Sequence, residues 1–284
     1  MRPELTGKLP EVSVVMSVYA PPEKAVFFDA VNSIILQSFT DWEMIIYDDG
    51  CTPDGSELIK EAARLDERIV YIKGKENKGL GFGLNRCIAQ SRGRYIARMD
   101  ADDVSLPGRI MKQRDFLENN PGFAWVGSNA QLIDSSGRWG VWKMPREPLP
   151  EDFLKYSPFI HPCVMFRKEV FENGGYTQDN KRAEDYELFM KLYCAGLKGY
   201  NLQEVLFCYR EDYAAYRRRK YSFHIHEVKI RLTGFKSLGL LNIKGLAFAL
   251  KPLFVGLIPA KLLSGIKRRI RKRTYVERHR KREA

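Results

Sequence analysis

Three aspartates follow a short apolar segment in the first half of this sequence. Residues 94–99 have the length and the β-branched, aromatic and aliphatic content of a strand, and Asp100, Asp102 and Asp103 come directly after them. Carboxylates this close together repel one another, and a divalent cation is the usual neutralising group. Because Mn²⁺ and Mg²⁺ prefer hard oxygen ligands, the spacing predicts a metal site that leaves room for phosphate oxygens. For an isolated pair of aspartates, a solvated turn before a helix is the more common explanation.

Two further acidic pairs stand at the ends of predicted elements. Asp48 and Asp49 follow a predicted strand over residues 43–47, and Glu184 and Asp185 open a predicted amphipathic helix. Aspartates also form turns before glycine, and acids favour the first turn of a helix, so each pair alone is more often structural. If the strands are parallel, the first pair and the three aspartates lie on one rim of a sheet, where open α/β folds bind ligands.

Strands and helices alternate through the first hundred residues. Near-continuous apolar segments at 11–19 and 43–47 are typical of strands buried on both faces of a parallel sheet. The alternation predicts a doubly wound α/β sheet. The other expected elements are strands at 68–72, 123–126, 163–166 and 205–209, helices at 27–35, 56–65, 109–118 and 183–193, a glycine-rich helix start at 77–85, and a loop-rich segment between 126 and 163.

The positive charge of the chain is concentrated at its C-terminal end. The 284 residues carry a net charge of +12, yet residues 214–284 hold 20 Lys and Arg against three acids, while residues 1–213 hold 27 against 32. An acidic body argues against a nucleic-acid partner, which needs a basic face across the fold. The five cysteines have no CxxC spacing and favour a reducing compartment. The N-terminal residues lack a signal-peptide pattern, so a cytoplasmic location is expected.

An apolar segment over residues 238–263 is interrupted by Lys244, Lys251 and Lys261. Its longest uninterrupted stretch, residues 252–260, has nine residues, whereas a membrane-spanning helix needs roughly 20. Basic clusters follow at 267–273 and 278–282. The pattern predicts a segment that lies on an anionic membrane surface without crossing it. A helix packed on the body, with a solvated basic end, is the alternative.

Taken in order, the motifs resemble those of the family 2 glycosyltransferases. The matching segments, between residues 12 and 210, are VSVVMSVY, DDGCTPDG, NKGLGFGLN, RYIARMDADD, LPGR, HPCVMFR and GGYTQDNKRAEDYELFMKL. The sequence departs from the family pattern at Cys51, where serine is frequent, and at Gly81 and Gly83, where alanine is frequent. The resemblance implies a GT-A fold, a mixed sheet with a Rossmann-like half for the nucleotide sugar over 1–105 and an acceptor half over 106–213. Residues 214–284 are then a helical, basic appendage.

The resemblance also implies roles on the donor side. It predicts transfer of a sugar from a nucleotide donor, usually linked to UDP, with inversion at the anomeric carbon. Asp102 matches the position expected to bind Mn²⁺ or Mg²⁺, and Asp100 the position near the ribose and the water shell of the metal. The other expected nucleotide contacts are Ser17 and Asp49, which match positions that hold uracil, and Asn77 and Asn85, which flank the glycine-rich turn.

On the acceptor side, inversion requires a base opposite the leaving group. Asp185 matches the family's base, and Glu184 beside it is expected to orient the acceptor or raise the basicity of Asp185. His161 is a candidate for the acceptor pocket, although a histidine beside a proline is more often structural. The expected acceptor is a saccharide, free or linked to a polyprenyl diphosphate, in surface-polysaccharide assembly at the inner face of the membrane.

Nucleotidyltransferases are a competing class, because they also bind nucleotides and a metal on a doubly wound sheet. They usually carry a basic, glycine-rich signature near the N-terminus, and residues 17–22 have neither the glycines nor the arginine for it. A nucleic-acid-binding protein that uses the basic tail is the non-enzymatic alternative. The motif set favours the glycosyltransferase over both, and the sequence leaves the transferred sugar open.

Overall fold

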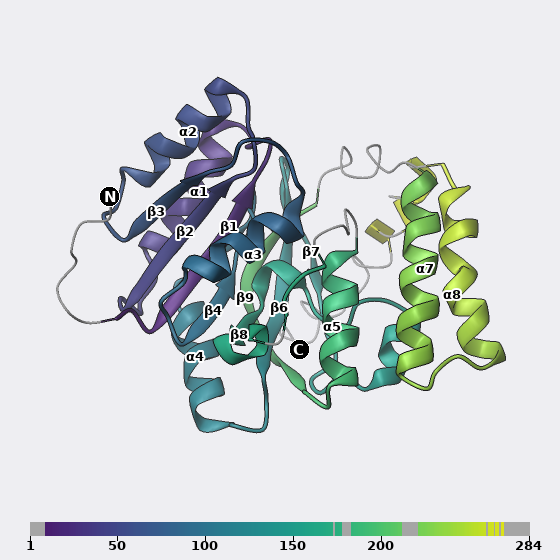
Figure 1. The fold of residues 1–284 in the computed structure, drawn as a ribbon. Helices are drawn as coiled ribbons and strands as arrows, with labels where there is room; N and C mark the ends of the chain where they lie inside the picture. Colours follow the sequence, from purple (N-terminus) through teal and green to yellow (C-terminus); the bar gives the residue numbers. More distant parts are fainter. Residues whose placement is uncertain are drawn as a thin grey trace, which may run out of the picture.

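A mixed β-sheet with helices on both faces forms the body of the protein (Figure 1). The computed structural model describes residues 9–172, 174–177, 183–211 and 221–259, together with 261–263, 265–266 and 268–269. Within those residues the sheet has nine strands in the order β3-β2-β1-β4-β8-β6-β9-β5, with β7 paired to β6. The strands are β1 (Val12–Val18), β2 (Trp42–Asp48), β3 (Ile69–Lys73), β4 (Tyr95–Arg98), β5 (Val104–Ser105), β6 (Trp125–Asp134), β7 (Gly137–Trp142), β8 (Met165–Arg167) and β9 (Gly199–Arg210).

Helices cover both faces of the sheet. They are α1 (Lys24–Ile35), α2 (Pro53–Ala63), α3 (Leu80–Gln90), α4 (Arg109–Asn119), α5 (Glu184–Cys194), α7 (Tyr221–Ser237) and α8 (Ile243–Gly256), with short 3-10 helices η1 (Pro150–Leu154), η2 (His161–Cys163) and η3 (Lys168–Phe171). On one face, α1, α2 and α4 bury apolar side chains such as Phe27, Ile59 and Ile110. On the other, α3 and α5 bury Leu84 and Phe189. Both faces of the central strands are therefore shielded from water.

The strands β1, β2 and β4 run parallel, so their carboxyl ends meet at one rim of the sheet. Val18 is paired with Asp48, and Val15 with Arg98. Every residue of β2 and β4 is buried, as are all but one of β1, which explains why these segments are largely apolar. The prediction that Asp48, Asp49 and the three aspartates after β4 share one rim is confirmed.

The second half contains more strand than the sequence predicts. The prediction of a loop-rich segment after residue 126 is wrong, because β6 continues to Asp134 and pairs with β7 as a hairpin. β9 begins at Gly199, earlier than predicted, and runs parallel to β6 with register shifts. These strands are hard to predict from the sequence because they contain buried polar residues. Asn129 of β6, for example, is fully buried but hydrogen-bonded to two backbone groups.

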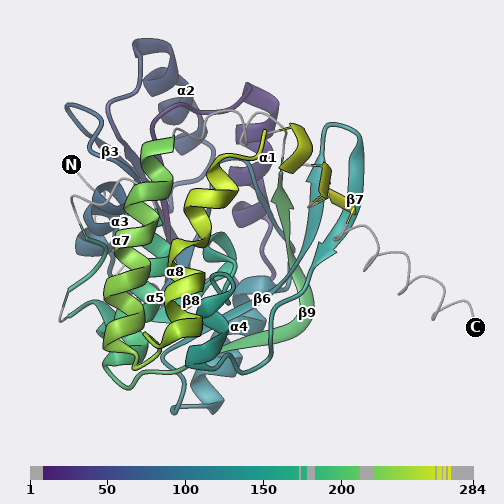
Figure 2. The same ribbon diagram turned by 90° about the vertical axis from the view of Figure 1, so that its right-hand side faces the viewer.

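The C-terminal helices α7 and α8 lie side by side and pack on the α5 side of the sheet (Figure 2). Phe235 of α7 and Ala249 of α8 are fully buried and belong to the same core as α5. This part of the chain is therefore packed on the body. No helix of the described residues is both long and apolar enough to span a bilayer. The predicted domain boundary at residue 213 lies outside the described residues and stays a prediction.

Candidate active site

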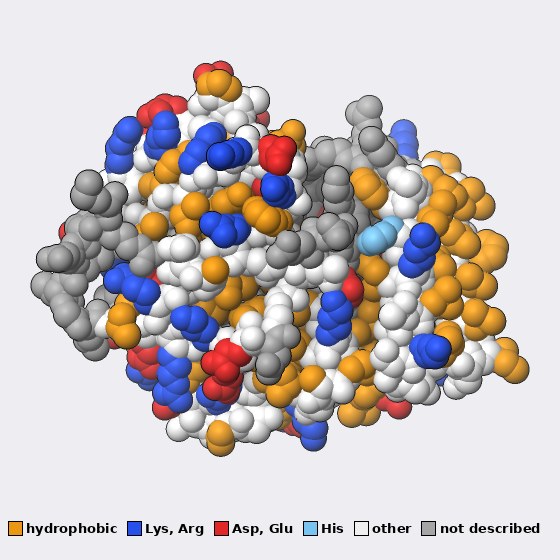
Figure 3. Space-filling model, viewed as in Figure 1, with side chains coloured by type: hydrophobic (Ala, Val, Ile, Leu, Met, Phe, Trp, Pro, Cys, Tyr) orange, Lys and Arg blue, Asp and Glu red, His pale blue; other side chains and the backbone are white. Residues whose placement is uncertain are grey.

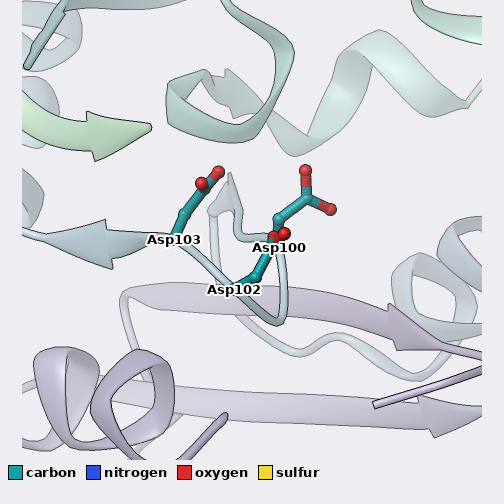
Figure 4. A group of neighbouring side chains, drawn as sticks. All are labelled: Asp100, Asp102 and Asp103. Carbon is teal, nitrogen blue, oxygen red and sulfur yellow. The ribbon is translucent and has the colours of Figure 1, made fainter. Parts of the chain in front are cut away.

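The turn after β4 carries three carboxylates within reach of one cation (Figure 4). Ligand oxygens of Asp100, Asp102 and Asp103 all lie within 4.8 Å of one another. Asp103 is 1% exposed, and the other two are half-buried. Burial, with the charge of Asp100, raises the pKa of Asp102 to about 6 and holds the pKa of Asp103 well above its ordinary value. A divalent cation relieves this repulsion, so the donor set fits Mn²⁺ or Mg²⁺.

Two arginines that come after this turn in the sequence hold it in place. Arg109 of α4 is fully buried, and its Nη2 donates to the backbone oxygen of Arg98 at 2.7 Å. At the end of β9, the backbone N–H of Arg210 donates to Oδ1 of Asp103 at 2.7 Å, and its Nε donates to the backbone oxygen of Asp102 at 2.9 Å. The position of the carboxylates therefore depends on both halves of the chain.

Arg98, the last residue of β4, is a buried cation behind the turn. Its side chain is 3% exposed, and its Nη1 lies 2.5 Å from Oδ2 of Asp100. Its Nε has no hydrogen-bond partner among the residues that the structure describes. No motif in the sequence points to a role for Arg98. Its one notable feature is a charged side chain inside a buried strand. Arg98 offsets part of the negative charge of the three carboxylates.

Replacing Arg98 with methionine is expected to lower the free energy of unfolding by about 3 kcal/mol. This is the low end of the range for removing one partner of a buried ion pair, because the Asp100 side chain is 31% exposed. Mn²⁺ is expected to raise the melting temperature of this variant more than that of the wild type, since the cation takes over the neutralisation of Asp100. Thermal unfolding with and without Mn²⁺ measures both effects.

The matched control is Arg94→Met, which removes an exposed ion pair with Glu118 next to the same strand. It is expected to cost at most about 1 kcal/mol and to leave the response to Mn²⁺ unchanged. Equal stability losses in the two variants would contradict the role of Arg98.

On the donor side, Asp49 holds the loop that leads into α3. Its Oδ1 accepts the backbone N–H of Lys78 at 2.9 Å, and its Oδ2 accepts that of Gly79 at 2.8 Å. Burial raises the pKa of Asp49 although both hydrogen bonds oppose this. Asn77 is exposed in the same loop. The predicted contacts of Asp49 and Asn77 with a nucleotide stay predictions, and the geometry puts both residues at the shared rim.

Asp48, by contrast, has a structural role. It is fully buried and accepts hydrogen bonds from the Cys51 backbone N–H at 2.8 Å, the Tyr71 hydroxyl at 2.8 Å and Nζ of Lys73 at 2.9 Å. Burial alone raises its pKa, but these hydrogen bonds, together with one from Ser56, hold the pKa well below its usual range. Asp48 therefore stays charged and fixes the end of β2.

Ser17 lies where α3 approaches β1 closely. A Cβ added at Gly83 would lie 2.0 Å from Oγ of Ser17 and 2.9 Å from the ring of Tyr47. The alanine that is frequent in the family pattern therefore does not fit at residue 83 unless Ser17 moves. Ser17 is half-buried and stands near the loop that Asp49 holds, which agrees with a place in the nucleotide site. Its contact with uracil stays a prediction.

Tyr176 connects α3 with the residues that are predicted to face the acceptor. Asn85 donates from Nδ2 to the backbone oxygen of Tyr176 at 2.7 Å, and its Oδ1 accepts the Tyr176 N–H at 3.0 Å. The Tyr176 hydroxyl lies 2.6 Å from Nε2 of His161. The negative charges of Glu184 and Asp185 act on the same buried phenol. The structure therefore brings four predicted site residues around Tyr176, a residue that the sequence analysis missed.

Asn85 and His161 thus have structural contacts in this site. The amide of Asn85 is engaged with the Tyr176 backbone through both its oxygen and its nitrogen. His161 is 7% exposed, and burial, reinforced by the charge of Arg98, keeps its pKa well below the ordinary value, so the ring is neutral. Direct contacts of Asn85 with the nucleotide and of His161 with the acceptor stay predictions.

Asp185 stands half-buried in the first turn of α5. Burial raises the pKa of its carboxyl, the backbone N–H of Tyr186 and the charge of Arg98 oppose this, and the charge of Glu227 in α7 adds to it. A carboxylate with a raised pKa is a better proton acceptor near neutral pH. Arg98 therefore acts on both Asp100, through an ion pair, and Asp185, through its charge.

Comparison with known proteins identifies the class to which this arrangement belongs. A family model described as glycosyl transferase family 2 matches residues 13–175. EpsE of Bacillus subtilis (strain 168), a protein provisionally named a glycosyltransferase, is 34% identical over 259 residues, which cover 90% of this chain and 92% of that protein. The chain therefore belongs to the family 2 glycosyltransferases and is an enzyme.

A second relative and a solved structure agree with this assignment. The Escherichia coli enzyme UDP-Gal:alpha-D-GlcNAc-diphosphoundecaprenol beta-1,3-galactosyltransferase is 30% identical over 236 residues, 79% of this chain and 83% of that protein. Mannosyltransferase PcManGT from Pyrobaculum calidifontis, solved with GDP-Man and Mn²⁺, superposes with a TM-score of 0.61 over 94% of this chain and 84% of that chain, at 16% identity. The structural likeness establishes the GT-A fold, and the predicted fold class is confirmed.

Proposed function

We propose that this enzyme transfers a sugar from a UDP-linked donor with inversion at the anomeric carbon, and that Asp102 and Asp100 hold the divalent cation it needs. The observation that carries the proposal is the arrangement around Arg98. Three carboxylates within 4.8 Å follow β4, Asp49 holds the loop before α3 on the same rim, and the charge of Arg98 acts on the carboxyl of Asp185.

Each part of this site has a separate task in the reaction. A bound Mn²⁺ or Mg²⁺ stabilises the charge that develops on the nucleoside diphosphate as it leaves. Asp49 and Ser17 line the site for the base of the nucleotide. Asp185 accepts the proton of the acceptor hydroxyl, and Glu184 beside it orients the acceptor. Tyr176 and His161 are hydrogen-bonded to each other and form the surface between the donor and acceptor positions.

The proposed acceptor is a saccharide linked to a polyprenyl diphosphate, in the assembly of a surface polysaccharide. The name of the Escherichia coli relative specifies a diphosphoundecaprenol acceptor and a UDP-galactose donor, which supports this choice. The mannosyltransferase was solved with a GDP-linked donor, so donor nucleotides have to be compared directly.

A donor screen tests the proposal. The full-length enzyme is incubated with UDP-glucose, UDP-galactose, UDP-N-acetylglucosamine and GDP-mannose, with Mn²⁺, with Mg²⁺ and with EDTA, and release of nucleoside diphosphate is measured. We expect release from a UDP-sugar only when a divalent cation is present. Turnover of GDP-mannose alone would overturn the UDP assignment, and full turnover in EDTA would overturn the metal assignment.

We also propose that α8 and the segment after it contact an anionic membrane. Large apolar side chains point outward there, with exposures of 92% for Ile243, 69% for Phe254 and 70% for Leu257, and Figure 3 shows hydrophobic side chains gathered over the end of the molecule that α7 and α8 form. Lys244 and Lys251 lie on the same helix. Most of the basic clusters at 267–273 and 278–282 fall outside the described residues.

A double variant, Phe254→Ser with Leu257→Ser, tests this contact. Each side chain contributes about 1.5 to 3 kcal/mol when buried in an apolar environment, so the pair is expected to lower partitioning into anionic vesicles at least tenfold, since about 1.4 kcal/mol is a factor of ten. Flotation on a density gradient measures the bound fraction. The control pair is Leu36→Ser with Leu65→Ser, which are also exposed but follow the C-terminal ends of α1 and α2. Wild-type protein that stays soluble at low salt would contradict membrane contact.

A further inference from the structure

The side chain of Arg231, in the middle of α7, is buried among four elements. It is 8% exposed. Its Nη1 donates to the backbone oxygens of Leu154 in η1 at 3.2 Å and of Phe248 in α8 at 3.5 Å. Its Nε donates to Oε1 of Glu227 on its own helix at 2.9 Å, and the guanidinium carbon lies 4.9 Å from the ring centre of Tyr186 in α5. One cation therefore ties together α5, η1, α7 and α8.

Tyr186 links Arg231 to the predicted base, because Tyr186 directly follows Asp185 in the first turn of α5. The ring is 4% exposed, and the hydroxyl donates to the backbone oxygen of Phe153. The N-cap residue of α5, Ala183, has a left-handed backbone with φ 57° and provides no side-chain cap. The first turn of α5 therefore depends on packing for its position, and the contact of the Tyr186 ring with Arg231 is one part of that packing.

The same helix brings a charge to Asp185. Glu227, which is paired with Arg231 at 2.9 Å, is close enough for its charge to act on the carboxyl of Asp185. Within the described part of the chain, the other charged and titratable groups that interact with that carboxyl or lie beside it are Arg98 of β4, Glu184 of α5 and the phenols of Tyr176 and Tyr186. The position and the electrostatic surroundings of the predicted base are therefore set partly from α7.

We propose that α7 is part of the catalytic unit and that Arg231 is the positioning residue that holds Asp185 in place through Tyr186. This inference rests on the proposed role of Asp185 as the base. It gives the C-terminal region a role in sugar transfer that is separate from contact with a membrane.

Arg231→Met tests the positioning role, because methionine keeps much of the side-chain bulk but loses the charge and the hydrogen bonds. We expect kcat for transfer to fall about 10- to 100-fold, the effect of displacing a reacting group by about 1 Å. The affinity for the UDP-sugar and metal-dependent hydrolysis of the donor by water should stay within about twofold, since the contacts of Arg231 among the described residues are with η1, α5, α7 and α8. Arg231→Lys should recover part of the rate, because the ammonium group still pairs with Glu227 and faces Tyr186.

The matched control is Lys236→Met, which removes an exposed cation from the last turn of the same helix. It should transfer at the wild-type rate. Every variant is assayed well below its own melting temperature, measured by thermal unfolding, so that a loss of folded protein is not counted as a loss of turnover.

Glu227→Gln provides a readout that a purely structural role would not move. Removing the negative charge favours ionisation of Asp185 at lower pH, so the acidic limb of the kcat profile is expected to shift to lower pH. Glutamine keeps an oxygen that accepts the Arg231 hydrogen bond. Without the negative charge of Glu227, the positive charge of Arg231 also favours ionisation of Asp185, so it moves the acidic limb to lower pH as well. An unshifted limb would contradict the electrostatic part of the inference.

The outcomes separate this inference from the function on which it rests. Normal transfer by Asp185→Asn would overturn the base assignment, and the positioning role would fall with it. An inactive Asp185→Asn together with a fully active Arg231→Met would overturn only the positioning role. Loss of donor binding and of transfer in equal proportion in Arg231→Met would show that the arginine merely supports the fold.

Discussion

Asp102→Asn is expected to lower sugar transfer at least about 100-fold and to remove the response to Mn²⁺, while the fold stays intact. The neutral amide is a poor ligand for a hard cation, and the other two carboxylates do not replace the lost charge. Because Asp100 and burial already disfavour the ionised form of Asp102, removing that charge should leave the free energy of unfolding unchanged or slightly higher. Initial rates against Mn²⁺ concentration, with thermal unfolding beside them, measure both effects.

The control for this variant is Asp29→Asn, an exposed aspartate on α1, which should transfer at the wild-type rate. Full activity of EDTA-treated wild-type enzyme would show that the metal assignment is wrong.

The pKa of Asp102, raised to about 6 by burial and by Asp100, predicts that metal binding depends on pH. Below that pH the carboxyl is protonated, so the affinity for Mn²⁺ should fall as the pH is lowered through 6, which calorimetric titrations at pH 5 and 7.5 compare.

Asp185→Asn is expected to lower transfer about 10²- to 10⁴-fold, the usual cost of losing a general base, with donor and metal affinities unchanged. The backbone N–H of Tyr186 and the charge of Glu227 act on its carboxyl, and Arg98 influences both this carboxyl and Asp100. Rapid-quench measurements of a single turnover, together with calorimetric titration of the UDP-sugar, separate chemistry from binding.

Glu184→Gln is the companion to that variant. If Asp185→Asn transferred normally and Glu184→Gln did not, the role of base would move to Glu184. NMR of the product gives an independent check on the mechanism, because inversion changes the anomeric coupling constant between donor and product. A product with the configuration of the donor would rule out the inverting mechanism for either carboxylate.

The nucleotide half of the fold is predictable because its strands are buried on both faces. β1 and β2 need almost unbroken apolar sequence, and that pattern stands out against the helices between them. The β6–β7 hairpin is different. Buried residues inside β6 include Gly127, Ser128 and Asn129. Close backbone packing and hydrogen bonds replace apolar side chains there, so the local sequence predicts a loop.

The carboxylates of the site follow from the sequence, but the residues between them do not. Asp100 and Asp102 stand at a strand end that the apolar pattern marks. Tyr176 reaches its place through contacts with Asn85, 91 residues away, and Arg231 contacts Leu154 across 77 residues. Neither contact leaves a periodic pattern in the sequence, because each depends on how two elements pack after they have formed.

The hydrogen bonds of Arg210 to Asp102 and Asp103 join two parts of the chain that are synthesised far apart in time. Asp103 and the backbone N–H whose hydrogen bond it accepts are 107 residues apart, so this hydrogen bond can form only after the chain has been synthesised as far as the end of β9. A nascent chain that has already exposed its three aspartates still lacks the strand that fixes them. During synthesis, the proposed cation site is therefore complete only after β9 has joined the sheet.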